Sequence, residues 1–461
     1  MSITKSLNRE ERLASARLLP LIMSMALPAI VAQLINLLYN IVDKIYIGHI
    51  PNIGTAGLAG IGVTHSIIIL VSAFAQIISG GGAPIAAIAL GRGDRKRAEK
   101  ILANGLSMLC FFTVICMAVT YIFMDPLLYA IGASDDTFVY AKDYLSIYMI
   151  GTVFVHITVG LNSFITCQGR SGIAMLSVLI GAVMNIVLDP IFIFVFDMGV
   201  AGAALATVIS QATSAIWILC FLFSKKATLR IKFPYMKPDI RIIGSIVALG
   251  IAPFVMASTE SLVGFVLNTG LKTYGGDIYI SALTVMQSAM QIVGVPLSGF
   301  TQGVTPVISY NFGAGNKKRV KDAFFISLVI MFTFNFVIIM AMILFPELFA
   351  SIFTSDEALI KVVKDIMPMF LAGMTIFGLQ RACQNTFVAL GQSLISLFIA
   401  LLRKVILLVP LAIILPYFIV PKVNGVFLAE PIADATCALL CTAIFFLKFK
   451  KMLSKCEKKE P

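Results

Sequence analysis

Two aspartates lie inside apolar stretches of this sequence, where a charged side chain is costly. Asp43 is in the stretch 18–47, and Asp189 follows Asn185 by four residues in the stretch 172–196. Residues four apart share one face of a helix, so Asn185 and Asp189 are expected to point the same way. Carboxylate and amide oxygens in a low dielectric can bind a proton or Na⁺. The spacing therefore predicts a cation-binding site, with no metal beyond a Na⁺ at Asp189.

A polar stripe runs along the first apolar stretch. Its members recur at steps of three and four residues, which places them on one face of a helix. They are Gln33, Asn36, Asn40 and Asp43. Thr207, in the stretch 199–223, lies at a membrane depth close to that of Asp189. These residues predict one coupling site, and the alternative is a polar cluster that only ties helices together.

The later part of the chain has a different set of polar residues. Glu260 lies in the stretch 242–270, and Gln287 and Gln291 lie in the stretch 279–312. Three basic residues also lie away from the ends of apolar stretches in this part of the chain, namely Arg381, Arg403 and Lys404. Buried opposite charges generally pair, so Glu260 has either a functional role or a structural ion pair with one of these cations.

The elements that must position these residues are membrane-spanning helices. The 461 residues are 59% hydrophobic and 13% charged, whereas soluble proteins have roughly 25% charged residues. About 20 apolar residues cross a bilayer as a helix. Twelve stretches meet this requirement, at 18–47, 57–89, 101–124, 140–167, 172–196, 199–223, 242–270, 279–312, 323–345, 360–389, 393–419 and 426–449. The chain is therefore predicted to be an all-α polytopic membrane protein.

The chain contains an internal repeat. Gly91 and Gly313 each begin a basic loop, and the step from one to the other along the chain equals the step from Gly81 to Gly303. Six helices return the chain to its starting side, so two six-helix bundles are expected to be related by a pseudo-two-fold axis along the membrane normal. The predicted division is an N-terminal lobe at 1–223, a cytoplasmic linker at 224–241 and a C-terminal lobe at 242–461.

The two predicted lobes differ in their polar residues. At the same step along the chain, the positions equivalent to Asn185 and Asp189 hold Leu407 and Leu411. Leucine side chains supply no oxygen ligand. The repeat therefore predicts that ion coupling belongs to the first lobe.

The positive charge of the chain indicates its orientation. Most of the 35 lysines and arginines lie in one alternating set of loops and in the terminal segments, which include the clusters at 92–100 and 317–321. By the positive-inside rule, both termini are cytoplasmic. A nucleic-acid-binding protein would instead gather its basic residues on a soluble domain. The net charge of +12 therefore predicts no nucleic-acid partner.

Motifs of enzymes are absent from the sequence. It contains no Walker A sequence, no zinc motif among its three histidines and eight cysteines, and no nucleophile constellation. We therefore expect neither catalytic residues nor a cofactor.

Several motifs, in their order and spacing, resemble the multidrug and toxic compound extrusion (MATE) family over nearly the whole chain. They are Pro28 to Gly48 with Asn40 and Asp43, Asn185-x-x-x-Asp189-Pro190, Gly199 to Gly202 before Thr207, and Gly425 to Pro431. The resemblance implies a secondary active exporter that antiports cationic amphipathic organic compounds against H⁺ or Na⁺ by alternating access. We expect a monomer in the cytoplasmic membrane, with small organic cations and membrane lipid as its partners.

The resemblance also implies roles for individual residues. The coupling ion would bind at Tyr39, Asp43, Asn185, Asp189 and Thr207. The substrate cleft would contain Gln33, Asn36, Asn40, Asn162, Glu260, Gln287 and Gln291, and the first helix would bend at Pro28. Another branch of the family binds its ion between a helix-7 glutamate and a helix-10 aspartate. Glu260 matches that glutamate, but the helix-10 stretch 377–383 has no carboxylate.

One alternative function is a lipid-linked glycan flippase of the related fold. Such a protein would need several cleft arginines to bind phosphates. The candidates are Arg381, Arg403 and Lys404, all in the second half of the chain.

Overall fold

The computed structural model describes residues 9–51, 54–454 and 456, and these residues form helices and short connections without a strand. The first half of the chain forms α1 (Arg9–Ser15), α2 (Leu18–Gly48), α3 (Gly54–Ile77), η1 (Ile78–Gly82), α4 (Ala83–Gly91), α5 (Arg95–Ile122), α6 (Met124–Ile131), α7 (Asp135–Ile150), α8 (Thr152–Thr166), α9 (Ser171–Pro190), η2 (Ile191–Val195) and α10 (Gly199–Phe223). The short helix η3 (Phe233–Met236) follows.

The second half has an equivalent succession of helices. It forms α11 (Ile240–Tyr274), α12 (Asp277–Gly313), α13 (Lys317–Leu344), α14 (Pro346–Ser351), α15 (Glu357–Leu371), η4 (Ala372–Ile376), α16 (Phe377–Ala389), α17 (Ser393–Leu401), η5 (Leu402–Leu408), α18 (Val409–Ile414), η6 (Leu415–Tyr417) and α19 (Lys422–Ser454).

The number of spans agrees with the predicted fold class, which is confirmed. Within the described residues, eleven helices are long and apolar enough to cross a membrane, and α7 with α8 makes a twelfth span bent by 57°. The span predicted at 140–167 is this bent pair and not one straight helix. Gly151 lies at the bend, and a Cβ there would be 2.4 Å from Val208 Cγ2. The glycine thus lets α10 approach the bend closely.

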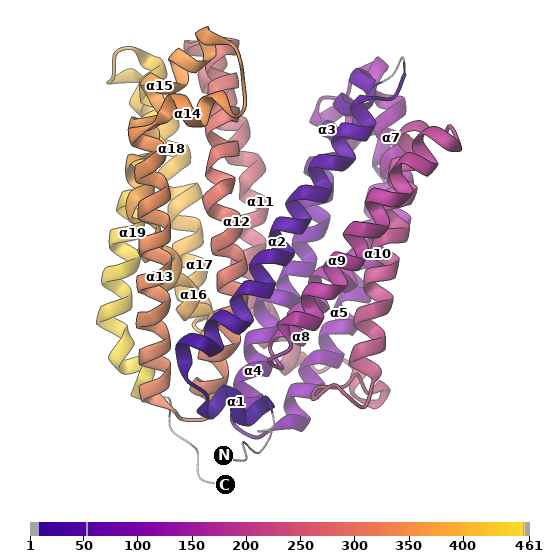
Figure 1. Ribbon diagram of the computed structural model, residues 1–461, viewed down its shortest axis with the longest axis vertical. Coiled ribbons are helices and arrows are strands. Elements are labelled where there is room, and N and C mark those ends of the chain that lie inside the picture. The colour runs from indigo at the N-terminus through magenta and orange to yellow at the C-terminus, as the bar shows by residue number, and fades with distance from the viewer. Residues whose placement is uncertain (1–8, 52–53, 455, 457–461) are drawn as a thin grey trace, which may run out of the picture.

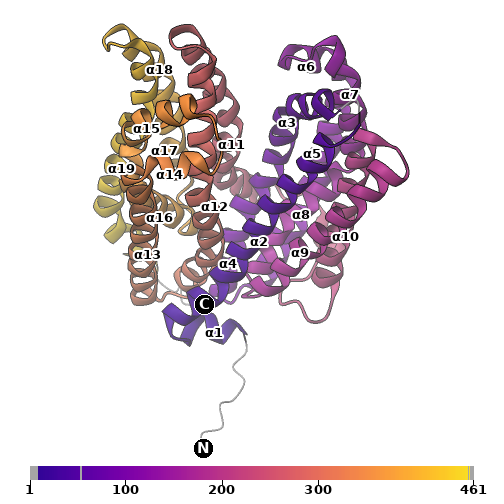
Figure 2. The same cartoon turned by 45° about the horizontal axis from the view of Figure 1, so that its top comes forward.

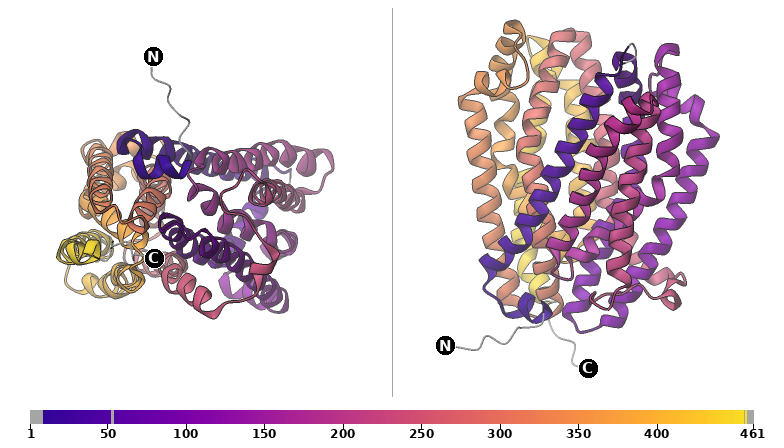
Figure 3. Two further views of the ribbon diagram at one scale, coloured as in Figure 1. Left: turned by 90° about the horizontal axis from the view of Figure 1, so that it is seen from below. Right: turned by 45° about the vertical axis from the view of Figure 1, so that its right-hand side comes forward.

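The two halves diverge toward one end of the molecule and meet at the other (Figures 1 and 2). The α1 helix and the last turns of α19 lie at the end where the halves meet (Figure 1). In the view from below, the two halves lie side by side (Figure 3). Parts of the basic terminal segments, residues 1–8 and 457–461, lie outside the described residues.

Glycines that are equivalent in the repeat form the contact between the halves. A Cβ on Gly91 would lie 2.0 Å from the Tyr310 carbonyl oxygen, and a Cβ on Gly313 would lie 2.0 Å from the Ile88 carbonyl oxygen. Ile88 and Tyr310 are themselves equivalent positions of the repeat. The contact between α4 and α12 is therefore reciprocal, as a pseudo-two-fold axis requires, and it depends on the absence of side chains.

A second pair of glycines joins the same halves. A Cβ on Gly81 would lie 2.1 Å from the Ile246 carbonyl oxygen of α11, and one on Gly303 would lie 2.4 Å from the Ala26 Cα of α2. Ala26 is two residues before Pro28, which lies inside the continuous helix α2. Bending at Pro28 stays a prediction, and any such bend would move α2 against α12.

We expect Gly313→Ala to destabilise the contact between the halves. The added methyl group would force two backbones apart, and overpacking typically costs about 1–3 kcal/mol. Thermal unfolding of the detergent-solubilised protein would measure the loss. Gly244→Ala in α11 is the matched control, because nothing lies within 4 Å of its Cβ position and both variants gain the same helix propensity. Equal melting temperatures for the two variants would contradict the expectation.

The connection between the halves docks on α5. Lys232 forms an ion pair with the buried Glu99 at 2.5 Å. Asn104 accepts a hydrogen bond from the Asp239 backbone N–H at 2.8 Å and donates one to the Tyr235 carbonyl oxygen at 3.2 Å. This segment is therefore held against the first half. The lobe boundaries predicted at 224–241 stay a prediction.

Candidate functional site

Asp189 lies at the end of α9 among polar neighbours. Asn185, one turn earlier, donates a hydrogen bond from Nδ2 to Asp189 Oδ1 at 3.1 Å. The same nitrogen lies 3.4 Å from Thr207 Oγ1 on α10. Asn185 and Asp189 are both buried. The structure thus brings three of the five predicted coupling residues together, because α9 and α10 pack along their lengths.

Asp43 and Tyr39 reach the same region from α2, which packs against α9. Asp43 is buried and interacts electrostatically with both Asp189 and Tyr39. The buried oxygens Asp43 Oδ1, Asn185 Oδ1 and Asp189 Oδ2 have no hydrogen-bond partner among the described residues. Buried oxygens are nearly always satisfied in folded proteins. This group of three therefore fits a bound proton or small cation.

Two tyrosines that were not predicted from the sequence lie beside this group. Tyr144 and Tyr148 on α7 are buried, and their rings stack with centroids 6.1 Å apart. Tyr144 interacts with the Thr207 hydroxyl and electrostatically with Asp43, while Tyr148 interacts with Ser72 and Tyr39. Their spacing of four residues was the available signal, since it places both rings on one face of a helix.

A polar cavity of about 430 Å³ opens between α2, α8, α9 and α10; we call it the first-half cavity. Gln33, Asn36 and Asn162 of the predicted cleft line it, together with Tyr39, Asn185 and Thr207 of the predicted coupling set. Asn162 donates a hydrogen bond to the Ala174 carbonyl oxygen at 3.3 Å and accepts one from Ser177 Oγ at 3.3 Å. Neither aspartate lines this cavity, but Tyr39 and Asn185, each one helical turn before an aspartate, do.

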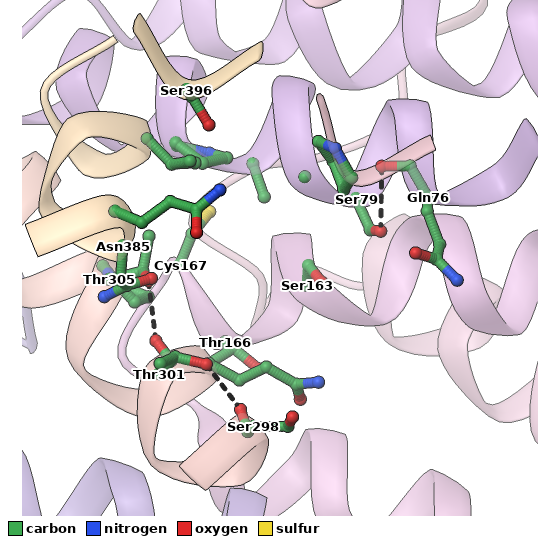
Figure 4. A pocket seen from close by; sticks show the side chains of 18 of the residues that line it. Gln76, Ser79, Ser163, Thr166, Cys167, Ser298, Thr301, Thr305, Asn385 and Ser396 are labelled. Atoms are coloured by element: carbon green, nitrogen blue, oxygen red, sulfur yellow. Dashed lines mark hydrogen bonds between the residues drawn. The ribbon is translucent and has the colours of Figure 1, made fainter. Parts of the chain in front are cut away.

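A second cavity of about 370 Å³ lies between the halves; we call it the interlobe cavity. Its walls come from α3, η1, α4 and α8 of the first half and from α11, α12, α16 and α17 of the second. Figure 4 shows labelled polar side chains from both halves around it. Five residues line both cavities, so the two spaces adjoin. They are Gln76, Ser79, Ser163, Thr166 and Gln302.

Four residues of the predicted cleft line neither cavity. Asn40 is exposed and donates to the Asn36 carbonyl oxygen of its own helix at 2.6 Å. Gln287 and Gln291 are exposed on α12, and Gln291 lies two turns before Ser298 on the same helix face. Glu260 lies one turn after Met256 on α11. Since Ser298 and Met256 line the interlobe cavity, Gln291 and Glu260 continue its wall toward the end where the halves diverge.

The basic residues of the second half have different partners. Arg403 Nε lies 2.5 Å from Asp434 Oδ1, and the Arg403 guanidinium lies 3.5 Å from Glu430 Oε1. Lys404 Nζ lies 3.3 Å from Glu260 Oε1. The π-helical segment η5 holds Arg403 and Lys404 in the interior, where both are buried. The sequence left open which cation pairs with Glu260, and in the structure that cation is Lys404.

No group of three or more potential metal-ligating side chains occurs in the part of the chain that the structure describes. The group formed by Asp43, Asn185 and Asp189 offers carboxylate and amide oxygens as ligands. Such ligands suit a hard cation such as Na⁺ and not a transition metal.

Comparisons with known proteins agree with this architecture. The family model described as MatE matches residues 28–191 and 253–414, one copy in each half. The multidrug export protein MepA of Staphylococcus haemolyticus is 26% identical over 424 residues, covering 92% of each chain. MepA of Staphylococcus aureus strain N315 is 26% identical over 428 residues, covering 92% of this chain and 93% of its own.

Solved structures share the fold. A MATE crystal structure in a bent conformation matches with a TM-score of 0.90 at 22% identity, covering 98% of this chain and all of its own. An outward-facing multidrug resistance MATE family transporter of the MOP superfamily matches with a TM-score of 0.89 at 21% identity, with the same coverage.

Proposed function

The chain belongs to the MatE family, and from this membership we propose that it is a multidrug exporter that antiports cationic amphipathic organic compounds against H⁺ or Na⁺. It is a multi-pass transporter of the cell membrane and not an enzyme. The MepA proteins, its relatives over 92% of the chain, are named multidrug export proteins. Because one chain contains both halves and the cavity between them, a monomer suffices for transport.

One observation carries the coupling proposal. Asp43, Asn185 and Asp189 each keep a buried oxygen without a hydrogen-bond donor among the described residues. A proton or Na⁺ bound there satisfies these oxygens and neutralises charge in a low dielectric. The site is therefore more stable with the cation than without it, which couples its occupancy to an ion gradient.

Alternating access follows from how the halves meet. The structure joins them through the Gly91 and Gly313 contacts at one end and separates them at the other (Figure 1). The basic loops favour a cytoplasmic position for the joined end, so the structure corresponds to an outward-open state. Asp43 lies on α2 and Asp189 on α9, so a cation bound between them would alter how these two helices pack, and it would compete with the organic cation through charge.

The flippase alternative gains little support from the second half. Arg403 forms ion pairs with Asp434 and Glu430. Lys404 forms an ion pair with Glu260. These two side chains are therefore unavailable to a pyrophosphate, and one arginine remains of the three candidates.

Proteoliposomes with an imposed pH gradient or an imposed Na⁺ gradient test the proposal. We expect at least one of the two gradients to drive accumulation of a fluorescent organic cation. The carboxylate and amide oxygens of the coupling site can bind either H⁺ or Na⁺, so both gradients must be tried. A matched set of vesicles with a K⁺ gradient controls for ion leakage. Absence of dye movement with every gradient, or dye movement driven by ATP alone, would overturn the proposal.

A further inference from the structure

Arg381 is the one charged side chain among the described residues that line the two cavities. It belongs to α16 and lines the interlobe cavity together with Ser298, Gln384 and Asn385. The two aspartates of the coupling group do not line either cavity. The space in which a substrate would sit is therefore amide- and hydroxyl-rich, with one positive charge.

The guanidinium of Arg381 is largely uncommitted. It donates one hydrogen bond, from an NH2 group to Ser298 Oγ at 3.0 Å, and lies 5.7 Å from the centroid of the Phe377 ring. Its Nε is buried without a hydrogen-bond partner among the described residues. No carboxylate in the described part of the chain forms a salt bridge with it, in contrast to the nearby Arg403, which has two.

This arrangement fits an oxyanion. A guanidinium offers five N–H donors in a planar fork that matches the two oxygens of a carboxylate. Removing such a group from water without an anionic partner is unfavourable, and a charge-assisted pair offsets the loss. The Ser298 hydroxyl adjoins the guanidinium and can donate to the same anion.

Other charges act on Arg381 from a distance. Arg403 repels it and Glu260 attracts it, but Glu260 is already paired with Lys404. Arg403 with Asp434 and Glu430 carries one net negative charge when all three are ionised. The competing explanation is that Arg381 only balances this negative charge and binds no ligand. The experiment must distinguish between these two roles.

We propose that Arg381, assisted by Ser298, binds a carboxylate of the transported compound in the interlobe cavity. The inference rests on the proposed export function and refines its substrate class. Preferred substrates are zwitterionic amphipathic compounds, which have a cationic apolar body and an acidic group. A compound that is only cationic lacks the group that Arg381 binds.

The test uses a matched pair of dyes, rhodamine B and its ethyl ester. They have the same cationic ring system, and only rhodamine B has a free carboxylate. Fluorescence anisotropy gives the dissociation constant of each dye for the purified full chain in detergent. We expect the wild type to bind the acid more tightly than the ester, and Arg381→Gln to reduce that ratio by about tenfold or more.

Two further variants keep the test informative if Arg381→Gln folds poorly. Arg381→Lys retains the charge without the fork, so it should reduce the ratio less than the glutamine variant does. Ser298→Ala should reduce it by only a few-fold. A ratio unchanged in all of these variants would show that Arg381 only balances charge, and would overturn the inference.

Competition and transport distinguish the remaining outcomes. Benzoate should displace rhodamine B from the wild type more effectively than phenyl phosphate does, and the reverse order would assign the site to phosphate and overturn the carboxylate assignment. In proteoliposomes, failure of the wild type to move either dye with any gradient would contradict the export function. Gradient-driven transport with an acid-to-ester ratio insensitive to Arg381→Gln would contradict this inference alone.

Discussion

Transport of a fluorescent organic cation driven by an ion gradient is expected to fall to background in Asp189→Asn. The carboxylate accepts a hydrogen bond from Asn185 at 3.1 Å, and its second oxygen is buried without a partner among the described residues. A carboxamide keeps the size of the side chain but cannot exchange charge with a proton, and it neutralises Na⁺ poorly. Coupling between two sites typically changes affinity by roughly 5- to 150-fold. Without coupling between the ion and the substrate, the ion gradient no longer drives transport.

The same assay should separate Asp189 from other carboxylates. Asp43→Asn is expected to show a similar loss, because Asp43 contributes a neighbouring buried oxygen. Asp143→Asn on α7 is the control, since Asp143 is exposed and lies outside the coupling group. Full gradient-driven transport by Asp43→Asn and Asp189→Asn would place the coupling ion elsewhere.

The largest loss of stability is expected from a substitution in the second half of the chain. We expect Asp434→Asn to lower the free energy of unfolding by about 3–5 kcal/mol, because it leaves the buried Arg403 without its closer partner. The distance from Arg403 Nε to Asp434 Oδ1 is 2.5 Å, and Glu430 at 3.5 Å compensates only in part. Chemical denaturation of the solubilised protein, followed by circular dichroism, measures the change.

An exposed ion pair provides the comparison. Lys142 and Asp125 lie 2.9 Å apart with both side chains about half exposed, so Asp125→Asn should change stability by no more than about 1 kcal/mol. Asp434→Glu retains the charge and should recover part of the loss. If Asp434→Asn and Asp125→Asn proved equally stable, the Arg403 pair would have no structural role.

The two halves of this repeated chain are expected to have different roles, ion coupling in the first half and structural ion pairing in the second. In the first half, carboxylate and amide oxygens without a partner among the described residues remain available to an ion. In the second half, Arg403 and Lys404 form ion pairs with acids around η5, so these acids already have a cationic partner even though Asp434 Oδ2 accepts no hydrogen bond from the described residues. Leu407 and Leu411, which replace Asn185 and Asp189 in the repeat, remove the second copy of the coupling group.

Much of the fold was predictable from local composition. Apolar stretches of about 20 residues indicate membrane spans whatever surrounds them, since an unpaired backbone cannot cross lipid. The constant step that relates Gly81 to Gly303 and Gly91 to Gly313 indicated the two-bundle repeat. The bend at Gly151 was not predictable from hydropathy, because it depends on the close approach of Val208 on α10.

The candidate site divides in the same way. The spacing of Asn185 and Asp189 predicted that both side chains lie on one face of a helix, because residues four apart share a face, and the structure adds the hydrogen bond between them. The involvement of Tyr144 and Tyr148 had to come from the structure, since it requires α7 to pack against α10 beside Thr207.

The sequence by itself determined that this chain spans a membrane as two repeated bundles and that two acids lie within the first. Hydropathy and helical period are properties of neighbouring residues, so they can be read along the chain. Only the tertiary structure decided which charges are satisfied. Arg381, Arg403 and Lys404 look alike in the sequence, yet two are paired and one lines the cavity. Ion pairing depends on side chains that approach within about 4 Å across different helices, and that geometry exists only after the helices pack.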